Sequence, residues 1–175
     1  MTSVLKVDNI QNSSGTSALS IDSSGRVTQP VVPAFRLEVD GQSFTSSGTK
    51  DVLLDTTVDS AGTNGRRFMQ GGIALANSNS RVSVPVTGVY QFNINCRVDG
   101  VGTGYLVFYL KHNDSSTSDS YHIEGTPSTS YQGVNLSTVF YLQAGDTVGS
   151  EIFVNSDTSW SIVASAGFFS GHLIG

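Results

Sequence analysis

Apolar and polar residues alternate along residues 82–98. The apolar side chains occupy even positions, as at Tyr90 and Phe92, while odd positions carry polar side chains such as Gln91 and Asn93. Successive side chains of a strand point to opposite faces of a sheet, so this pattern predicts a half-buried antiparallel strand.

Comparable runs recur from residue 34 to the end of the chain, with turn residues between them. The clearest are residues 34–39, 52–54, 105–111, 136–142, 148–154, 160–164 and 168–174. Residues 105–111 are almost continuously apolar, so we expect both faces of that strand to be covered. The final run ends in Leu173 and Ile174, which predicts a buried last strand. This many strands without a convincing helix predict an all-β sandwich.

The first 32 residues form a separate region. They hold three short strand-like runs, at residues 4–10, 18–21 and 26–28, and prolines at positions 30 and 33 stiffen the junction that follows. Three such strands bury no core of their own. We therefore predict an N-terminal attachment or trimerisation arm, residues 1–32, followed by one domain, residues 33–175. The arm is expected to pair with copies of itself around a three-fold axis or to dock on another protein.

Composition narrows the classes of function. Only 13% of the 175 residues are charged, and the net charge is -5 with a pI near 4.9. This balance argues against nucleic acid binding through phosphate neutralisation. The single cysteine, Cys96, lies on the apolar side of a strand, so we expect a small buried side chain and no disulfide. We also expect neither a secretory signal nor membrane insertion, because no charged leader precedes an apolar core and no run is long enough to cross a bilayer.

Candidate catalytic and metal-binding residues are few. His122 and Glu124 share one face of a strand, which fits either a weak metal site or an ordinary surface pair. Asp51, Asp55 and Asp59 are spaced by four residues but lack the closing glutamate of a calcium loop. A calcium ion between subunits stays open, and the sequence does not locate it. We assign no catalytic, cofactor-binding or metal-binding residue, and we expect no enzyme.

Aromatic residues alternate with polar neighbours along the predicted strands. This placement predicts a role in the core of the fold or in a subunit interface rather than in a sugar-binding surface. The residues assigned to this core, including three from the last strand, are Tyr90, Phe92, Phe108, Phe140, Trp160, Phe169, Gly171 and Leu173. Tyr121 and Tyr131 flank more polar segments and are the candidates for exposed contacts.

Three motifs follow one another in the predicted domain. Pro-x-x-Gly-x-Tyr-x-Phe is matched by Pro85, Gly88, Tyr90 and Phe92. Leu-x-x-Gly-Asp-x-Val is matched by Leu142, Gly145, Asp146 and Val148. Phe-Ser-Gly-x-Leu-Leu is matched by Phe169, Ser170, Gly171 and Leu173, with Ile174 in the last place. In order and spacing they resemble the C1q and tumour-necrosis-factor-like domains. The resemblance covers about residues 33–175 and implies a ten-stranded jelly-roll sandwich, three copies of which pack around an axis.

The N-terminal segment is similar to the strand-and-turn segments that open tail-fibre and other structural proteins of tailed bacteriophages. Together the two resemblances imply a homotrimeric virion protein, made in the host cytoplasm and attached to another virion protein through residues 1–32. We expect a tail fibre or adhesin that binds a glycan or protein on the host surface. A capsid decoration or head-fibre protein is the alternative, since an arm of about 32 residues is short for a fibre shaft. A depolymerase comes third, because no carboxylate pair can be nominated.

Overall fold

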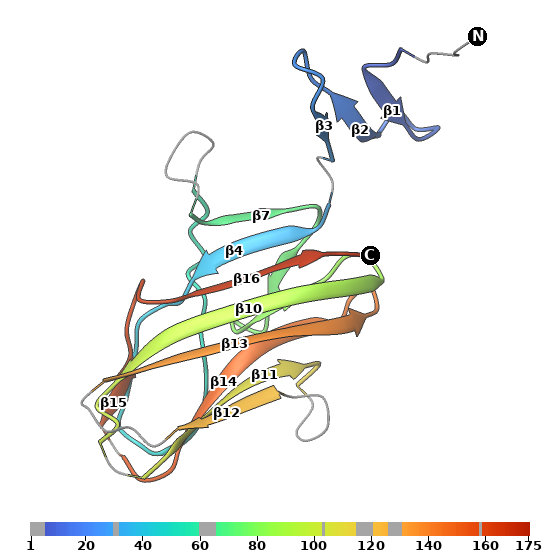
Figure 1. Cartoon of the computed structure of the whole chain (residues 1–175). Helices are drawn as coiled ribbons and strands as arrows, with labels where there is room; N and C mark the ends of the chain where they lie inside the picture. Colours follow the sequence, from blue (N-terminus) through green and yellow to red (C-terminus); the bar gives the residue numbers. More distant parts are fainter. Residues whose placement is uncertain are drawn as a thin grey trace. The chain divides into compact units, whose positions relative to one another are not determined.

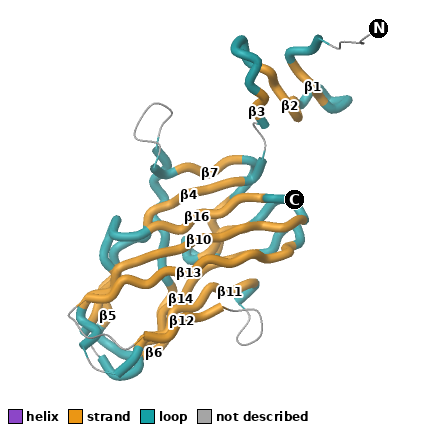
Figure 2. The backbone as a smooth tube through the Cα atoms, viewed as in Figure 1, coloured by secondary structure: helices purple, strands orange, loops and turns teal. Residues whose placement is uncertain are grey.

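The computed structural model describes residues 6–29, 32–59, 66–102, 104–114, 121–125, 131–157 and 159–175. These residues form strands and loops and contain no helix (Figures 1 and 2), so none of the described chain is a helix that could span a membrane. The chain divides into two compact units, Met1–Val32 and Pro33–Gly175. Each unit is described by itself below.

The larger sheet of the second unit is organised around one long strand, β10 (Gly88–Asp99). Along one edge, β10 pairs over its whole length with the equally long β13 (Tyr131–Leu142). Its other edge pairs with β16 (Phe168–Leu173) and, at its end, with β15 (Trp160–Ile162). The sheet is completed by β4 (Ala34–Glu38) and β7 (Phe68–Gln70) beyond β16, and by β5 (Gln42–Phe44) beyond β15.

The smaller sheet is organised around β14 (Thr147–Val154). On one edge it pairs with β11 (Leu106–His112), which pairs in turn with β12 (Tyr121–Gly125). On the other edge it pairs with β6 (Gly48–Asp51) and β9 (Arg81–Ser83), and β8 (Ala74–Ala76) lies beyond β9.

The expected all-β jelly-roll sandwich is therefore confirmed (Figure 1). Its described part has thirteen strands rather than ten, because several strands of only three or four residues flank the long ones.

The core lies between the two sheets, and the even positions of β10 face it. Its largest fully buried side chains are Tyr90, Phe35, Phe92, Phe108, Phe169, Leu37, Leu106, Leu110, Leu142 and Ile152. The Phe35 ring meets the Phe169 ring edge-on with centroids 5.0 Å apart, and Phe92 stacks 5.8 Å from Phe169. Burying each such ring contributes roughly 1.5–3 kcal/mol.

Gly171 occupies the middle of this aromatic cluster. A Cβ at this position would lie 2.6 Å from Cδ1 of Phe92 and 2.8 Å from Cε1 of Phe35. The two rings fill the space that a side chain would need, so the third sequence motif has a steric cause. The glycine of the first motif, Gly88, also has a steric cause, because a Cβ there would lie 2.6 Å from the Leu173 side chain. Its φ is not positive, so the backbone conformation does not require glycine at this position.

The last strand is central, as expected, because β16 lies between β10 and β4. Phe169 is fully buried, but Ile174 is 51% exposed. The expectation was wrong for Ile174 because its side chain follows Leu173 in the strand alternation and so faces away from the core. Its backbone still pairs with β10, since the Ile174 amide donates to the Val89 carbonyl and the Val89 amide donates to the Gly175 carbonyl. Cys96 is buried as expected, and burial raises the pKa of its thiol to about 12.

The smaller sheet carries a buried arginine that the sequence did not reveal. Arg81 is 3% exposed and donates to Asp51 at 3.0 Å, Asp114 at 2.7 Å and Glu151 at 3.0 Å. Lys111 lies 2.6 Å from the other oxygen of Glu151. These charges join four segments of the sheet. Asp51 and Asp114 are about half exposed, whereas Arg81 is buried and is the partner that all three carboxylates share.

The first unit, called the arm below, is a three-stranded antiparallel meander. Its strands are β1 (Asn9–Gln11), β2 (Ser17–Ile21) and β3 (Val27–Thr28). Strands β2 and β3 agree with the runs expected at residues 18–21 and 26–28, whereas β1 overlaps only the end of the run expected at residues 4–10. None of the described arm residues is fully buried, because a single small sheet has no second layer to cover it.

Candidate subunit interface

The candidate site is the outer face of the larger sheet, on the side away from the core. Three odd positions of β10, Gln91, Asn93 and Asn95, run along its middle, and strand register places their neighbours. Paired residues of β16, β10 and β13, in that order, form three rows of side chains across the face. The rows are His172–Gln91–Val139, Ser170–Asn93–Ser137 and Phe168–Asn95–Asn135. This surface is called the outer face below.

Apolar side chains gather at one end of the outer face. Tyr141 is 69% exposed and Val139 is 50% exposed, two residues apart on β13. Val89 lies opposite Tyr141 on β10 and is half-buried. Isolated exposed apolar residues are ordinary on a protein surface, but adjacent ones of this size form a patch that favours contact with another protein.

The middle of the outer face is polar and hollowed. An open hollow of about 510 Å³ is lined by Asn93, Asn95, Asn135, Ser137, Phe168 and Ser170, with the backbone of the two neighbouring strands beneath. The Ser137 hydroxyl donates to Oδ1 of Asn93 at 2.7 Å, and the Phe168 amide donates to Oδ1 of Asn95 at 3.0 Å. These bonds fix the carboxamides of both asparagines, so the hollow presents ordered, uncharged hydrogen-bonding groups.

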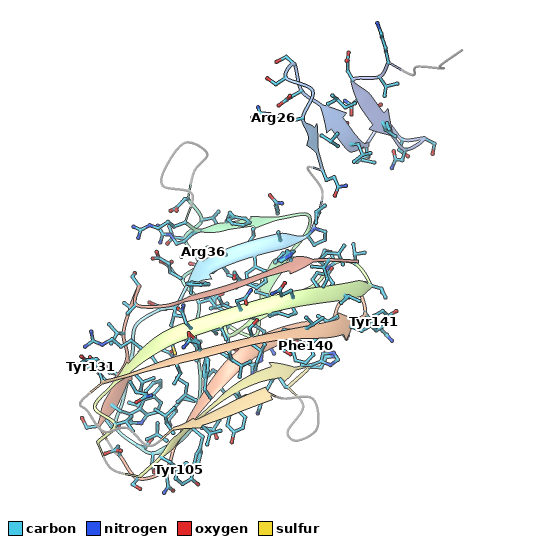
Figure 3. All side chains as sticks on the ribbon, viewed as in Figure 1. Arg26, Arg36, Tyr105, Tyr131, Phe140 and Tyr141 are labelled. Carbon is cyan, nitrogen blue, oxygen red and sulfur yellow. The ribbon has the colours of Figure 1, made fainter. Side chains whose placement is uncertain are left out.

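An ordered aromatic residue marks the other end of the face. Figure 3 shows Tyr131 and Tyr141 at opposite ends of β13. Tyr131 is 56% exposed, and the Arg97 guanidinium lies 4.8 Å from its ring centroid. Arg97 also holds both oxygens of Asp99, at 2.6 and 2.8 Å. Tyrosine and arginine are enriched in protein interfaces, and here the arginine charge is already neutralised.

The residues expected in a fold or trimer core lie mainly inside one protomer. Tyr90, Phe92, Phe108, Trp160 and Phe169 are at most 3% exposed. The remaining large side chains of that set, at positions 140 and 173, are partly buried and pack against the same core. Because these side chains are occupied within the sandwich, a subunit interface would have to use other, exposed residues.

Of the two tyrosines expected at exposed contacts, the structure describes the side chain of only one. Tyr131 is exposed on the outer face. Tyr121 begins β12, but its side chain lies outside the described residues, as do the side chains of His122 and Glu124. Those expectations therefore stay predictions.

The three aspartates spaced by four are held by arginines. Besides Asp51, which pairs with Arg81, Asp55 and Asp59 bind Arg67 at 2.6 and 2.9 Å. The hydrogen bond from Arg67 lowers the pKa of Asp59. Among the side chains that the structure describes, no group of three His, Cys, Asp or Glu residues is close enough together to hold a metal ion.

Asp146 of the second motif holds a turn and its neighbours together. It accepts from His112 at 2.9 Å, from Asn113 at 2.7 Å and from the Gln143 amide at 2.8 Å. Burial raises the pKa of Asp146, but the hydrogen bonds from Asn113, Gln143 and His112 outweigh it, so the pKa is lowered overall. This carboxylate is fully used in structure, which argues against its acting as an acid catalyst.

Sequence reasoning missed the apolar patch of the outer face. A signal was present, because Val139, Phe140 and Tyr141 are consecutive apolar residues on one strand. Such a run requires apolar side chains on both faces of the strand, of which the core covers only one.

The chain was compared with known proteins. No protein-family model and no curated protein matches it. Among solved structures, murine APRIL at pH 8.0 superposes with a TM-score of 0.59 and 14% identity over 82% of this chain and 99% of that chain. The globular domain of zebrafish complement 1qA superposes with a TM-score of 0.55 and 20% identity over 82% and 98%. The sandwich has a C1q/TNF-like jelly-roll fold. At these identities the likeness concerns the fold alone.

Proposed function

We propose that the chain forms a homotrimer through the outer face and serves as a non-enzymatic binding protein. The observation that carries this proposal is the patch of Val89, Val139 and Tyr141 beside the ordered hollow on an otherwise polar sheet. A stable interface buries on the order of 1,200–2,000 Å² and combines an apolar centre with hydrogen-bonding groups. The outer face offers both kinds of group.

Three copies are the number that the sequence resemblance implies. A ring of three closes when the outer face of one chain meets a different surface of the next, so every copy uses the same pair of surfaces. The low share of charged residues, 13%, suits such packing because few charges lose their hydration.

We further propose that the trimer is a bacteriophage virion protein, in the role of a tail fibre or adhesin. The similarity of the N-terminal segment to phage tail-fibre proteins supports the virion context. Three sandwiches on one axis would bind a repeated glycan or protein of the host surface through effective concentration, so each single contact could be weak. Residues 1–32 would connect the trimer to another virion protein after synthesis in the host cytoplasm.

A capsid decoration or head-fibre protein is the second candidate. The observation that favours it is the small size of the arm, whose strands have only three, five and two residues and supply little length for a shaft. Gold-labelled antibody against residues 33–175 on intact particles separates the roles. Label at the tail supports the adhesin, label over the head supports decoration, and unlabelled particles would refute the virion assignment.

The interface itself is tested with a matched pair of substitutions. Val139→Lys places a charge in the patch, whereas Val58→Lys places the same charge at a loop valine of similar exposure, 42%, near Asp55 and Asp59. We expect Val139→Lys to raise the dissociation constant of the trimer at least tenfold, because burying an unpaired ammonium is costly. Native mass spectrometry measures this. Equal dissociation constants for the two variants would show that the outer face is not part of the subunit interface.

A further inference from the structure

The arm has one apolar face and one polar face. Strand register places Ile10 opposite Leu19 and Ile21 opposite Val27. Leu19 and Ile21 are two residues apart on β2, so all four aliphatic side chains share one side of the sheet. On the other side, Asn9 lies opposite Ser20, whose hydroxyl donates to Oδ1 of Asn9 at 3.2 Å. The four aliphatic residues are called the apolar face of the arm.

This face is uncovered within the arm. Val27 is 61% exposed, Ile10 48% and Ile21 37%, while Leu19 is half-buried. A single sheet without a second layer leaves its apolar side in contact with water, and an exposed apolar patch favours packing against another surface. The arm therefore needs an occupant for this face.

The arm is also built from a repeated unit of ten residues. Asn-Ser-Ser-Gly at residues 12–15 is followed by Asp-Ser-Ser-Gly at residues 22–25. In both turns the first side chain accepts from the amides two and four residues later, at 2.9 to 3.0 Å. Both turns close with a glycine in the left-handed region, at φ 82° for Gly15 and 78° for Gly25.

The repeated turns have a structural consequence. Side-chain capping of this kind fixes the turn from local sequence alone. The arm is thus an ordered element with a preset register, and each unit contributes an aliphatic pair to the same face.

We propose that the apolar faces of three arms pack against one another, so that the arm is a second, separate trimerisation element. This inference rests on the proposed homotrimer. The arm continues directly into the sandwich, with Val32 followed by Pro33, so a trimer of sandwiches holds three arms on short tethers. Tethering on short linkers produces effective concentrations in the millimolar range, enough for small faces to associate.

The chemistry of the face suits identical copies better than a different partner. All four of its members are aliphatic, so the face offers no charge or hydrogen bond by which a specific foreign protein would be chosen. The charged pair of the arm, Asp22 and Arg26 at 2.6 Å, is already satisfied within its own turn. A virion partner would then contact the polar side of the arm, where Asn9 and Ser20 lie.

Disulfide trapping in the full chain tests the inference. Val27→Cys places a thiol on the apolar face, and Ala18→Cys places one at an exposed position of β2 on the opposite side. The native Cys96 is buried, with the pKa of its thiol raised to about 12, so the unaltered chain serves as the background. Each variant is oxidised at low micromolar concentration and run on a non-reducing denaturing gel, and the native mass of the unaltered chain is measured in parallel.

We expect Val27→Cys to link two of the three chains in each trimer, and Ala18→Cys to remain at the background. Equal linking of the two variants in a chain with trimeric native mass would overturn the inference and leave the proposed homotrimer standing, with the apolar face docked elsewhere. A monomeric native mass would overturn the proposed homotrimer, and the inference with it. The gel therefore tests the arm, and the native mass tests the trimer.

Discussion

The two units of the chain bury their apolar residues differently. The sandwich covers the inward-facing positions of its strands with a second sheet, so residues such as Phe92 and Leu106 are fully buried within one protomer. The arm has the same alternation and the same antiparallel pairing but only one layer, and Val27 is left 61% exposed. Alternation thus determines which face of a strand is apolar, and the number of layers determines whether the chain alone can cover it.

The largest effect should come from opening the core of the sandwich. Phe169→Ala removes a fully buried ring from the aromatic cluster, and we expect the free energy of unfolding to fall by about 4 kcal/mol. Ile174→Ala is the control at the same end of the chain, because Ile174 is 51% exposed, and it should change stability by less than about 0.5 kcal/mol. Urea denaturation measures both. Similar losses for both variants would show that the assigned core is wrong.

A smaller effect on stability is expected from the loss of the Asp146 charge, either at low pH or by substitution. The lowered pKa of Asp146 contributes stability that is present above the ordinary value of 3.8 and is lost as the pH falls through the lowered pKa. Asp146→Asn should lower the melting temperature at pH 7, since the hydrogen bonds to His112 and Asn113 weaken. The deficit should shrink as the pH falls below 3.8 and through the lowered pKa, at which the carboxylate of the folded, unaltered chain is protonated too. A deficit that stays constant from pH 7 to pH 3 would contradict this role of the charge.

The smallest effect on the sandwich is expected from the arm. Ile21→Asp puts a charge on the apolar face, and Ala18→Asp puts the same charge on the opposite side of β2. Neither should change the unfolding of the sandwich by more than about 0.5 kcal/mol, because the arm is a separate unit. Only Ile21→Asp should make the arm more sensitive to proteolysis in the trimer. Equal sensitivity of the two variants would show that the apolar face is not covered by other arms.

The part of the structure that could be predicted from sequence is the part that follows from local alternation. Parity along β10 identifies its core side chains, including Cys96, without knowledge of its neighbours. Three motifs with steric or turn requirements then indicate the fold. Gly171, for example, is required by two aromatic rings, and that requirement is visible as a motif.

The rest depends on which strands become neighbours. Arg81 meets Asp51, Asp114 and Glu151 only because four distant segments converge on one sheet. The patch of the outer face likewise arises because Tyr141 lies opposite Val89 across two strands about 50 residues apart in sequence. Likewise, the four aliphatic residues of the arm are seen to share one face only when the pairing of β1 with β2 and of β2 with β3 is known. Alternation alone does not supply such registers.

The measurement that tests the central claim most directly is the native mass of the full, unaltered chain at about 1 μM. The account predicts three times the chain mass of 18.4 kDa, because the outer face and the apolar face of the arm both require other copies. A mass of one chain at that concentration would contradict the account, since it would leave both faces exposed in a stable monomer.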